Sequence, residues 1–162
     1  VLYRGYTCSG FNEDSFGAVG LDANLRAADK TIDYAIFNIS HPLLENKGFR
    51  IGDSTNLHVG DQVTVIGYPN FQKGDSPYIQ NCAITSKKTF LEAPFYTVSG
   101  RIVHGASGGV VLNSKREVIG IIKGGVQTFR DDEDAGNDNQ GFVPIHLAID
   151  HMMKCETENG VQ

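Results

Sequence analysis

Residues 103–113 read VHGASGGVVLN and set Ser107 among glycines, directly before a short apolar run. A polar turn at residues 113–116 and a second apolar run at residues 117–125 follow. Two apolar runs joined by a short polar turn predict a β-hairpin. Glycines beside a serine let successive N–H groups point to one spot next to its hydroxyl, as an oxyanion hole requires. Taken alone, the stretch fits either a nucleophilic serine or a glycine-rich loop of an all-β protein.

The composition favours a strand-rich protein. Nineteen glycines punctuate short apolar runs in a chain of 162 residues that has no tryptophan. The formal charge of −5 comes without a basic stripe, so nucleic acid is not an expected partner. No run approaches the roughly 18 apolar residues of a membrane span, so no membrane partner is expected either.

The cysteines and acidic residues indicate neither a metal nor a cofactor. Cys8, Cys82 and Cys155 lie far apart and lack the spacing of a zinc site. Their odd number excludes a complete disulfide framework and favours a reducing, intracellular compartment, while the N-terminus shows neither an initiator methionine nor a signal peptide. The acidic loop at residues 131–138 could offer carboxylates to calcium, but it lacks the EF-hand spacing and is expected to be a solvated loop.

The order of the expected elements indicates a β-barrel or sandwich with one terminal helix. Apolar and β-branched runs predict strands at residues 31–39, 60–69, 78–86, 89–98, 108–113 and 118–124. Residues 41–58 are expected to be a connector. Apolar residues at helical spacing after Pro144 predict an α-helix over Ile145–Lys154.

The pentapeptide GASGG at residues 105–109 also fits the nucleophile elbow of α/β-hydrolases. That elbow needs a helix after the serine, whereas here a β-hairpin is expected. Helices do not alternate with the other expected strands. The α/β-hydrolase is therefore the weaker of the two enzyme hypotheses.

Four segments in order resemble chymotrypsin-like (trypsin-fold) serine proteases, and most closely the disulfide-poor branch that includes glutamyl endopeptidases. The Ser107 hairpin resembles the family's nucleophile hairpin, and residues 33–37, DYAIF, resemble the strand that carries the triad aspartate. Residues 65–69, VIGYP, resemble the family's Ile-Gly-Tyr-Pro turn. Residues 141–144 and the final helix are similar to its last strand and C-terminal helix. The interval from Asp33 to Ser107 is typical of that branch.

The resemblance implies an all-β double barrel of the trypsin-like type with a C-terminal α-helix. Residues 1–45 would be the remainder of an N-terminal barrel that is incomplete in this chain. Residues 46–59 would connect the barrels, residues 60–144 would form the second barrel, and residues 145–156 the helix. Asp33 and Ser107 would face each other across the cleft between the barrels.

The resemblance also implies the catalytic roles. Ser107 would attack the scissile carbonyl of a polypeptide substrate, and the N–H groups of Gly105 and Ser107 would hold the oxyanion. Asp33 would orient a histidine and stabilise its imidazolium. Without the family pattern, Asp33 would instead be a turn or strand-edge carboxylate.

The histidine departs from the family pattern. In the family it precedes the aspartate, whereas His41, His58, His104, His146 and His151 all follow Asp33. Val1-Leu2-Tyr3 resembles the apolar residues that follow the catalytic histidine. The chain is therefore expected to begin just after it, with an N-terminal segment completing the first barrel.

None of the histidines in the sequence is expected to be the catalytic base or a metal ligand. His104 shares a loop with Ser107 and is too close in sequence to act as its base. His146 and His151 are five residues apart, a poor metal spacing, and are expected on the helix surface; His41 and His58 are expected in loops.

The sequence defines the substrate specificity less closely than it defines the catalytic residues. By resemblance, the substrate pocket would be walled by residues before Ser107, including Arg101 and His104, and by Ile122, Lys123 and Gly124. Ala106 replaces the family's acidic residue, so activation through a buried N-terminal ion pair is not expected. Two function classes stay open: a serine endopeptidase with Asp33 and Ser107 as catalytic residues, and an inactive protease-fold binding or scaffold domain.

Overall fold

The computed structural model describes residues 2–4, 7–9, 23–29, 31–39, 48–69, 72, 74–90, 93–103, 105–123 and 140–158. The strands are β1 Leu2–Arg4, β2 Thr7–Ser9, β3 Ala23–Asp29, β4 Tyr34–Ile39, β5 Gln62–Gly67, β6 Tyr78–Phe90, β7 Ala93–Val98, β8 Val110–Leu112, β9 Val118–Lys123 and β10 Gly141–Pro144. They are followed by helix α2, Ile145–Glu158. These elements confirm the predicted all-β class with a C-terminal helix.

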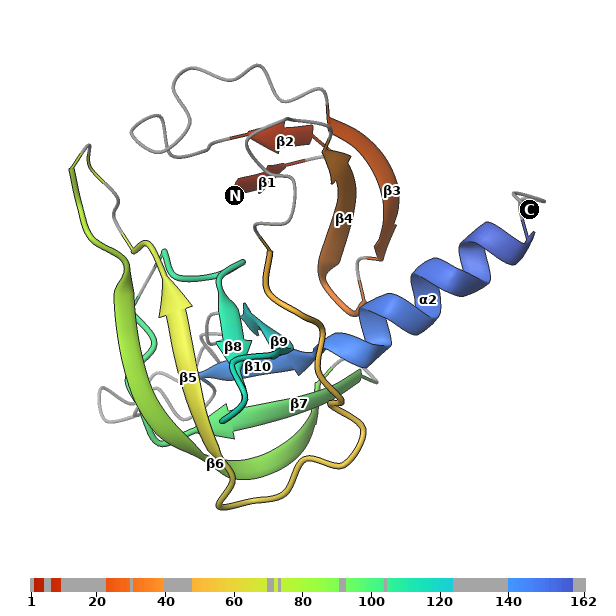
Figure 1. Ribbon diagram of the computed structural model, residues 1–162. Helices are drawn as coiled ribbons and strands as arrows, with labels where there is room; N and C mark the ends of the chain where they lie inside the picture. Colours follow the sequence, from red (N-terminus) through yellow and green to blue (C-terminus); the bar gives the residue numbers. More distant parts are fainter. Residues whose placement is uncertain are drawn as a thin grey trace, which may run out of the picture.

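Six antiparallel strands close into a barrel in the order β10-β7-β6-β5-β8-β9 (Figure 1). In β5, Val63 and Val65 are buried, while Gln62 at the start of the strand is exposed and Thr64 is half-buried. This alternation sends every second side chain into the barrel. The N-terminal strands form two separate two-stranded sheets, β1-β2 and β3-β4.

An aromatic side chain crosses the barrel interior because a glycine stands opposite it. Phe142 of β10 is fully buried and stacks on Tyr96 of β7, with ring centroids 5.6 Å apart. A Cβ atom on Gly120 of β9 would lie 2.2 Å from Phe142 Cδ2. Glycine at position 120 therefore makes room for the phenyl ring, and the ring fills the core between β7 and β9.

The start of helix α2 is tied to the segment that precedes the barrel. Ser54 is 1% exposed, and its Oγ accepts the backbone N–H of His146 at 3.0 Å. The same hydroxyl is 2.8 Å from His146 Nδ1. Because the first N–H groups of a helix lack intrahelical partners, Ser54 satisfies one of them from a distant part of the chain.

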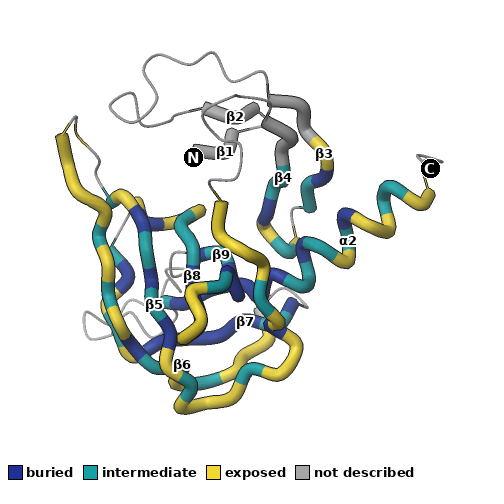
Figure 2. The backbone as a smooth tube through the Cα atoms, in the orientation of Figure 1, coloured by how far each residue is buried: buried dark blue, intermediate teal, exposed yellow. Residues whose placement is uncertain are grey.

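Helix α2 also packs on the β3-β4 hairpin, away from the barrel (Figures 1 and 2). Ala148 and Met152 of the helix are buried against Ala27 and Tyr34 of the hairpin. The Tyr34 hydroxyl is hydrogen-bonded to His151 Nδ1. The helix therefore connects the barrel to the N-terminal hairpin.

The strand predicted over residues 31–39 is wrong at its start. Residues 31–33 form a turn, and β4 begins only at Tyr34. Asp29 organises this turn, because its backbone oxygen accepts the Asp33 N–H at 2.9 Å and its Oδ1 accepts the Ile32 N–H at 2.7 Å. Asp33 has a φ of 64°, a left-handed conformation that a strand residue does not adopt.

Several other expectations differ from the structure. Strand β3 was not predicted, since its sequence ANLRAAD lacks the alternation of apolar and polar residues. Strand β6 runs unbroken to Phe90, and the helix continues past Lys154 to Glu158. His146 and His151 are half-buried and hydrogen-bonded rather than on the surface, because the helix faces the connector and the hairpin.

Alkaline pH should weaken the contact between α2 and the hairpin. Burial, and then the charges of Cys155 and Asp29, raise the pKa of Tyr34 from 10.0 to about 12. The folded state thus favours the neutral phenol. The contribution of the neutral Tyr34 phenol to the free energy of unfolding is complete below pH 10 and is lost as the pH rises through about 12. The free energy of unfolding, measured by denaturant titration, should therefore fall more steeply over this range in the wild type than in Tyr34→Phe.

The exposed Tyr68 provides the control, because Tyr68→Phe should keep the wild-type decline. Parallel alkaline declines in the wild type and Tyr34→Phe would contradict the prediction.

Candidate active site

Ser107 occupies the second position of a tight turn. The Gly109 N–H donates to the Ala106 carbonyl at 3.0 Å, which closes the turn over residues 106–109. Gly108 stands at the third position with a φ of 86°, the conformation that a type II turn requires there and that favours glycine. Ser107 is exposed. The turn therefore presents this serine to solvent.

A second tight turn directly precedes the first. The Ala106 N–H donates to the Val103 carbonyl at 3.0 Å, and Gly105 has a φ of 90°. Ala106 is 1% exposed and belongs to the core of the barrel. Ala106 thus anchors the loop to the barrel core at the point where the two turns meet, while Ser107 is exposed.

The edge of β9 fixes the loop on one side. The Gly108 N–H donates to the Ile122 carbonyl, and the Ile122 N–H donates to the Gly109 carbonyl, both at 2.9 Å. The Ile122 side chain is 2% exposed and lies in the barrel core. The Ser107 turn is therefore bonded to a strand that the core holds in place.

The end of β5 fixes the loop on the other side. An added Cβ on Gly109 would lie 2.4 Å from the Ile66 carbonyl oxygen, and one on Gly67 would lie 3.2 Å from Ala106 Cβ. Such distances show that the backbones of the loop and of β5 approach more closely than side chains would permit. The glycines that the sequence shows around Ser107 thus serve close backbone packing as well as turn geometry.

The structure brings Asp33 to the same strand end. Lys123 Nζ lies 3.1 Å from Asp33 Oδ2, and Lys123 follows Ile122 directly. The Lys123 side chain is 14% exposed and that of Asp33 is 54% exposed. The ion pair and the backbone bonds of Ile122 together link Asp33 to the Ser107 turn across two consecutive residues of β9.

The predicted pocket residues are described only in part. Ile122 points into the barrel core, and the ammonium group of Lys123 contacts Asp33. Arg101 is exposed. His104 and Gly124 lie outside the described residues, as do His41 and the acidic loop 131–138.

The contact between Lys123 and Asp33 was not predicted from the sequence. A lysine at the end of the apolar run VIGIIK was assigned to the pocket wall, and its contact with Asp33 was not foreseen. The available signal was a charged residue at the end of an otherwise apolar strand, since a lysine in such a place usually has a partner.

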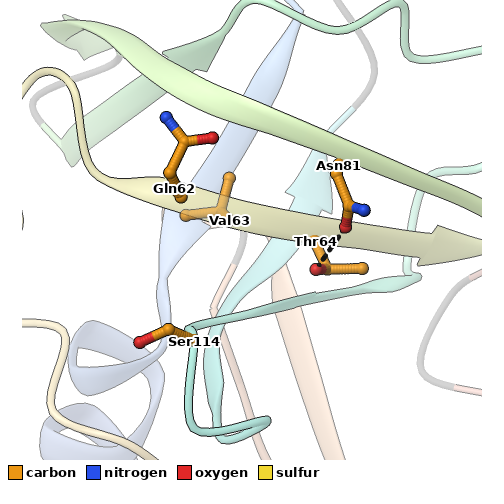
Figure 3. A pocket seen from close by; sticks show the side chains of 5 residues that line it. All are labelled: Gln62, Val63, Thr64, Asn81 and Ser114. Carbon is orange, nitrogen blue, oxygen red and sulfur yellow. Dashed lines mark hydrogen bonds between the residues drawn. The ribbon is translucent and has the colours of Figure 1, made fainter.

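A small cavity of about 250 Å³ lies elsewhere, on β5 and the hairpin turn between β8 and β9 (Figure 3). Thr64 Oγ1 and Asn81 Oδ1 are hydrogen-bonded at 2.8 Å in its wall. Its lining residues are Gln62, Val63, Thr64, Asn81 and Ser114. None of the predicted site residues lines it, and none of its side chains titrates, so it offers no acid–base chemistry.

The described residues hold neither a candidate metal centre nor a candidate membrane span. They contain no group of three or more histidine, cysteine, aspartate or glutamate side chains placed to hold a metal ion. Within the same residues, no helix has both the length and the apolar character to span a membrane.

Comparisons with known proteins identify the family. The sequence profile of the trypsin-like peptidase domain matches residues 8–121. A search of curated proteins gave no match.

Solved structures share the fold. The HtrA-type protease AlgW with a decapeptide superposes with a TM-score of 0.64 at 23% identity, covering 82% of this chain and 39% of that one. Rv3671c from M. tuberculosis H37Rv, an inactive form with serine replaced by alanine, gives a TM-score of 0.63 at 19% identity, covering 88% and 68%. This chain thus spans about two fifths of the AlgW chain. These likenesses confirm the trypsin-like fold expected from the sequence.

The close approach at Gly109 gives a prediction. Gly109→Ala should place its methyl group against the Ile66 carbonyl, lower the free energy of unfolding by about 1–3 kcal/mol and displace the Ser107 turn. Gly48→Ala is the control, since a Cβ there meets nothing within 4 Å, and its effect should stay within about 0.5 kcal/mol. Denaturant titration measures both. Equal stability of the two variants would show that the loop and β5 are not packed this closely.

Proposed function

This chain belongs to the family of trypsin-like peptidase domains, and from that premise we propose that it is a serine endopeptidase that forms an acyl-enzyme on Ser107. The observation that carries the proposal is the Ser107 turn. Ala106 is buried in the core, and the serine beside it is exposed. A nucleophile has to be accessible and held in place, and this turn meets both needs.

The proposed reaction has two stages. Ser107 Oγ attacks the carbonyl carbon of the scissile bond while an imidazole takes its proton, and the tetrahedral intermediate collapses as that proton passes to the leaving amine. Water then attacks the acyl-enzyme ester, giving up a proton to the imidazole, which returns it to Ser107 as the carboxylic acid product leaves.

We assign the oxyanion hole to the backbone N–H groups of Gly105 and Ser107. The turns closed by the Ala106 and Gly109 N–H groups fix the backbone on both sides of Gly105 and Ser107. Two tight turns in succession hold the loop rigid. Donors fixed before the reaction stabilise a developing oxyanion without reorganising, which is the main source of such catalysis.

Asp33 is proposed to orient the imidazole. The contact between Asp33 and Lys123 supports this role, because it holds the carboxylate at the end of β9, to which the Ser107 turn is bonded. A carboxylate beside an imidazole fixes the tautomer whose other nitrogen can accept the serine proton.

The general base is proposed to be a histidine that precedes Val1 in the intact protein. All histidines of the sequence follow Asp33, the reverse of the order in the family it resembles. Among the described histidines, His146 contacts Ser54, His151 contacts Tyr34, and His58 is exposed beside Asp61.

The proposed substrate is a polypeptide. Two of the similar solved structures hold a decapeptide and a tripeptide. The pocket for the residue before the scissile bond is proposed beside His104 and residues 122–124. With the Lys123 ammonium on Asp33, the ion pair gives no basis for a preference for acidic side chains in that pocket.

Loss of Ser107 tests the nucleophile. The intact protein should react with a fluorophosphonate probe and hydrolyse a polypeptide such as casein. Ser107→Ala should abolish labelling and lower kcat by about 10⁶-fold, because the triad acts as a unit. The control is Ser114→Ala in the exposed hairpin turn, which should label and hydrolyse like the wild type. Equal labelling of Ser107→Ala and wild type would contradict the assignment.

The histidine is tested in the same intact protein. Replacing the histidine nearest before Val1 by alanine should remove hydrolysis, and the wild-type activity should fall at acidic pH as that imidazole protonates, near pH 6.5–7. An intact protein that resists the probe and has no such histidine would be an inactive binding or scaffold domain instead.

A further inference from the structure

We propose that Lys123 is a positioning residue, whose ammonium group holds one oxygen of the Asp33 carboxylate and so directs the other oxygen toward the catalytic imidazole. The inference rests on the proposed role of Asp33. It gives Lys123 a function in the reaction other than contact with substrate.

The contact itself is a charge-assisted hydrogen bond. Lys123 Nζ, which can only donate, lies 3.1 Å from Asp33 Oδ2, which as a carboxylate oxygen accepts. The Lys123 side chain is only 14% exposed. A lysine that is largely removed from water is rarely found without a partner, because burial disfavours its charge. The ion pair therefore accounts for a charged residue at this position of β9.

Asp33 needs such a partner in order to have a fixed direction. It lies in a turn with a φ of 64°, and its side chain is 54% exposed. The backbone bond to Asp29 fixes the main chain of the turn but leaves the carboxylate free to rotate about its own bonds. Lys123, carried by a strand whose preceding residue lies in the barrel core, provides a rigid point of attachment for Oδ2.

The other charged groups around the turn face elsewhere. Asp29 of β3 uses Oδ1 to accept the Ile32 N–H, and its Oδ2 lies 3.8 Å from His151 Nε2 of α2. Among the described residues, the helix side of the turn therefore holds Asp29 and His151, and the barrel side holds Lys123. A positive charge thus reaches Asp33 from the end of β9 to which the Ser107 turn is bonded.

A fixed cation at this point has a consequence for the pH profile. It disfavours a second positive charge nearby, so it lowers the pKa of an imidazole that shares the Asp33 carboxylate. Removing the cation should raise that pKa. The acid limb of kcat/KM should then move to higher pH, and kcat should fall because the carboxylate is less well directed.

The experiment compares Lys123→Met, Lys123→Arg and Lys123→Gln in the intact protein, with Lys115→Met in the exposed hairpin turn as the control. Lys123→Met should lower kcat about 10-fold with KM nearly unchanged, and should move the acid limb upward by about one pH unit. Lys123→Arg should retain the acid limb and most of kcat, and Lys115→Met should match the wild type. Lys123→Gln, which keeps a donor without the charge, should show the shifted limb even if Lys123→Met fails to fold.

A measurement without activity separates this inference from the proposed function. In a double-mutant cycle of Asp33→Asn and Lys123→Met, the double variant should lose less in melting temperature than the two single variants together. Additive losses would overturn the ion pair, and an unchanged kcat and acid limb in Lys123→Met would overturn its positioning role. If the wild type hydrolyses no peptide, the proposed function fails and the positioning role fails with it, while the cycle still decides whether the contact exists.

Discussion

The backbone of Ile122 is the constraint on which the rest of the site depends. Its carbonyl accepts the Gly108 N–H, and its N–H donates to the Gly109 carbonyl, so one residue holds both glycines that follow Ser107. Its side chain is buried in the barrel core, and the next residue carries the partner of Asp33. A shift at this strand end would disturb the core, the Ser107 turn and the ion pair together. The geometry of the proposed site is thus tied to the packing of the barrel.

Local patterns were sufficient to predict the parts of the site that depend on short-range chemistry. The glycines around Ser107 and the apolar runs on both sides of the polar turn predicted the hairpin, because turn geometry and strand alternation are properties of adjacent residues. Strand β5 was predicted for the same reason. The turn at Asp33 was not, because the apolar residues after it favoured a strand, whereas Asp29 bonds the Ile32 and Asp33 N–H groups and closes a local turn. Strand β3 was not either, because it gains its apolar cover from helix α2, which is distant in sequence. The contact of Lys123 with Asp33 joins residues far apart in sequence, and no local pattern contains it.

Two glycine positions restrict the sequence of this barrel more tightly than its other core positions do. At Gly109 the limit is a backbone oxygen 2.4 Å from an added Cβ, and at Gly120 it is a phenyl ring at 2.2 Å. Such positions admit no side chain without movement of their neighbours, whereas most core positions accept another apolar residue of similar volume. At these two positions the close approach of neighbouring atoms therefore restricts the residue to glycine.

Helix α2 has a part in this arrangement although it lies outside the barrel. A two-stranded hairpin alone has too little buried surface to be stable in water, and β3-β4 gains its apolar cover from Ala148 and Met152 of the helix. The helix in turn begins where β10 ends, and Ser54 binds its first turn. Asp33 stands at the tip of that hairpin. The position of the proposed catalytic aspartate is thus set from two sides, by the helix that packs on its hairpin and by the lysine of β9 that holds its carboxylate.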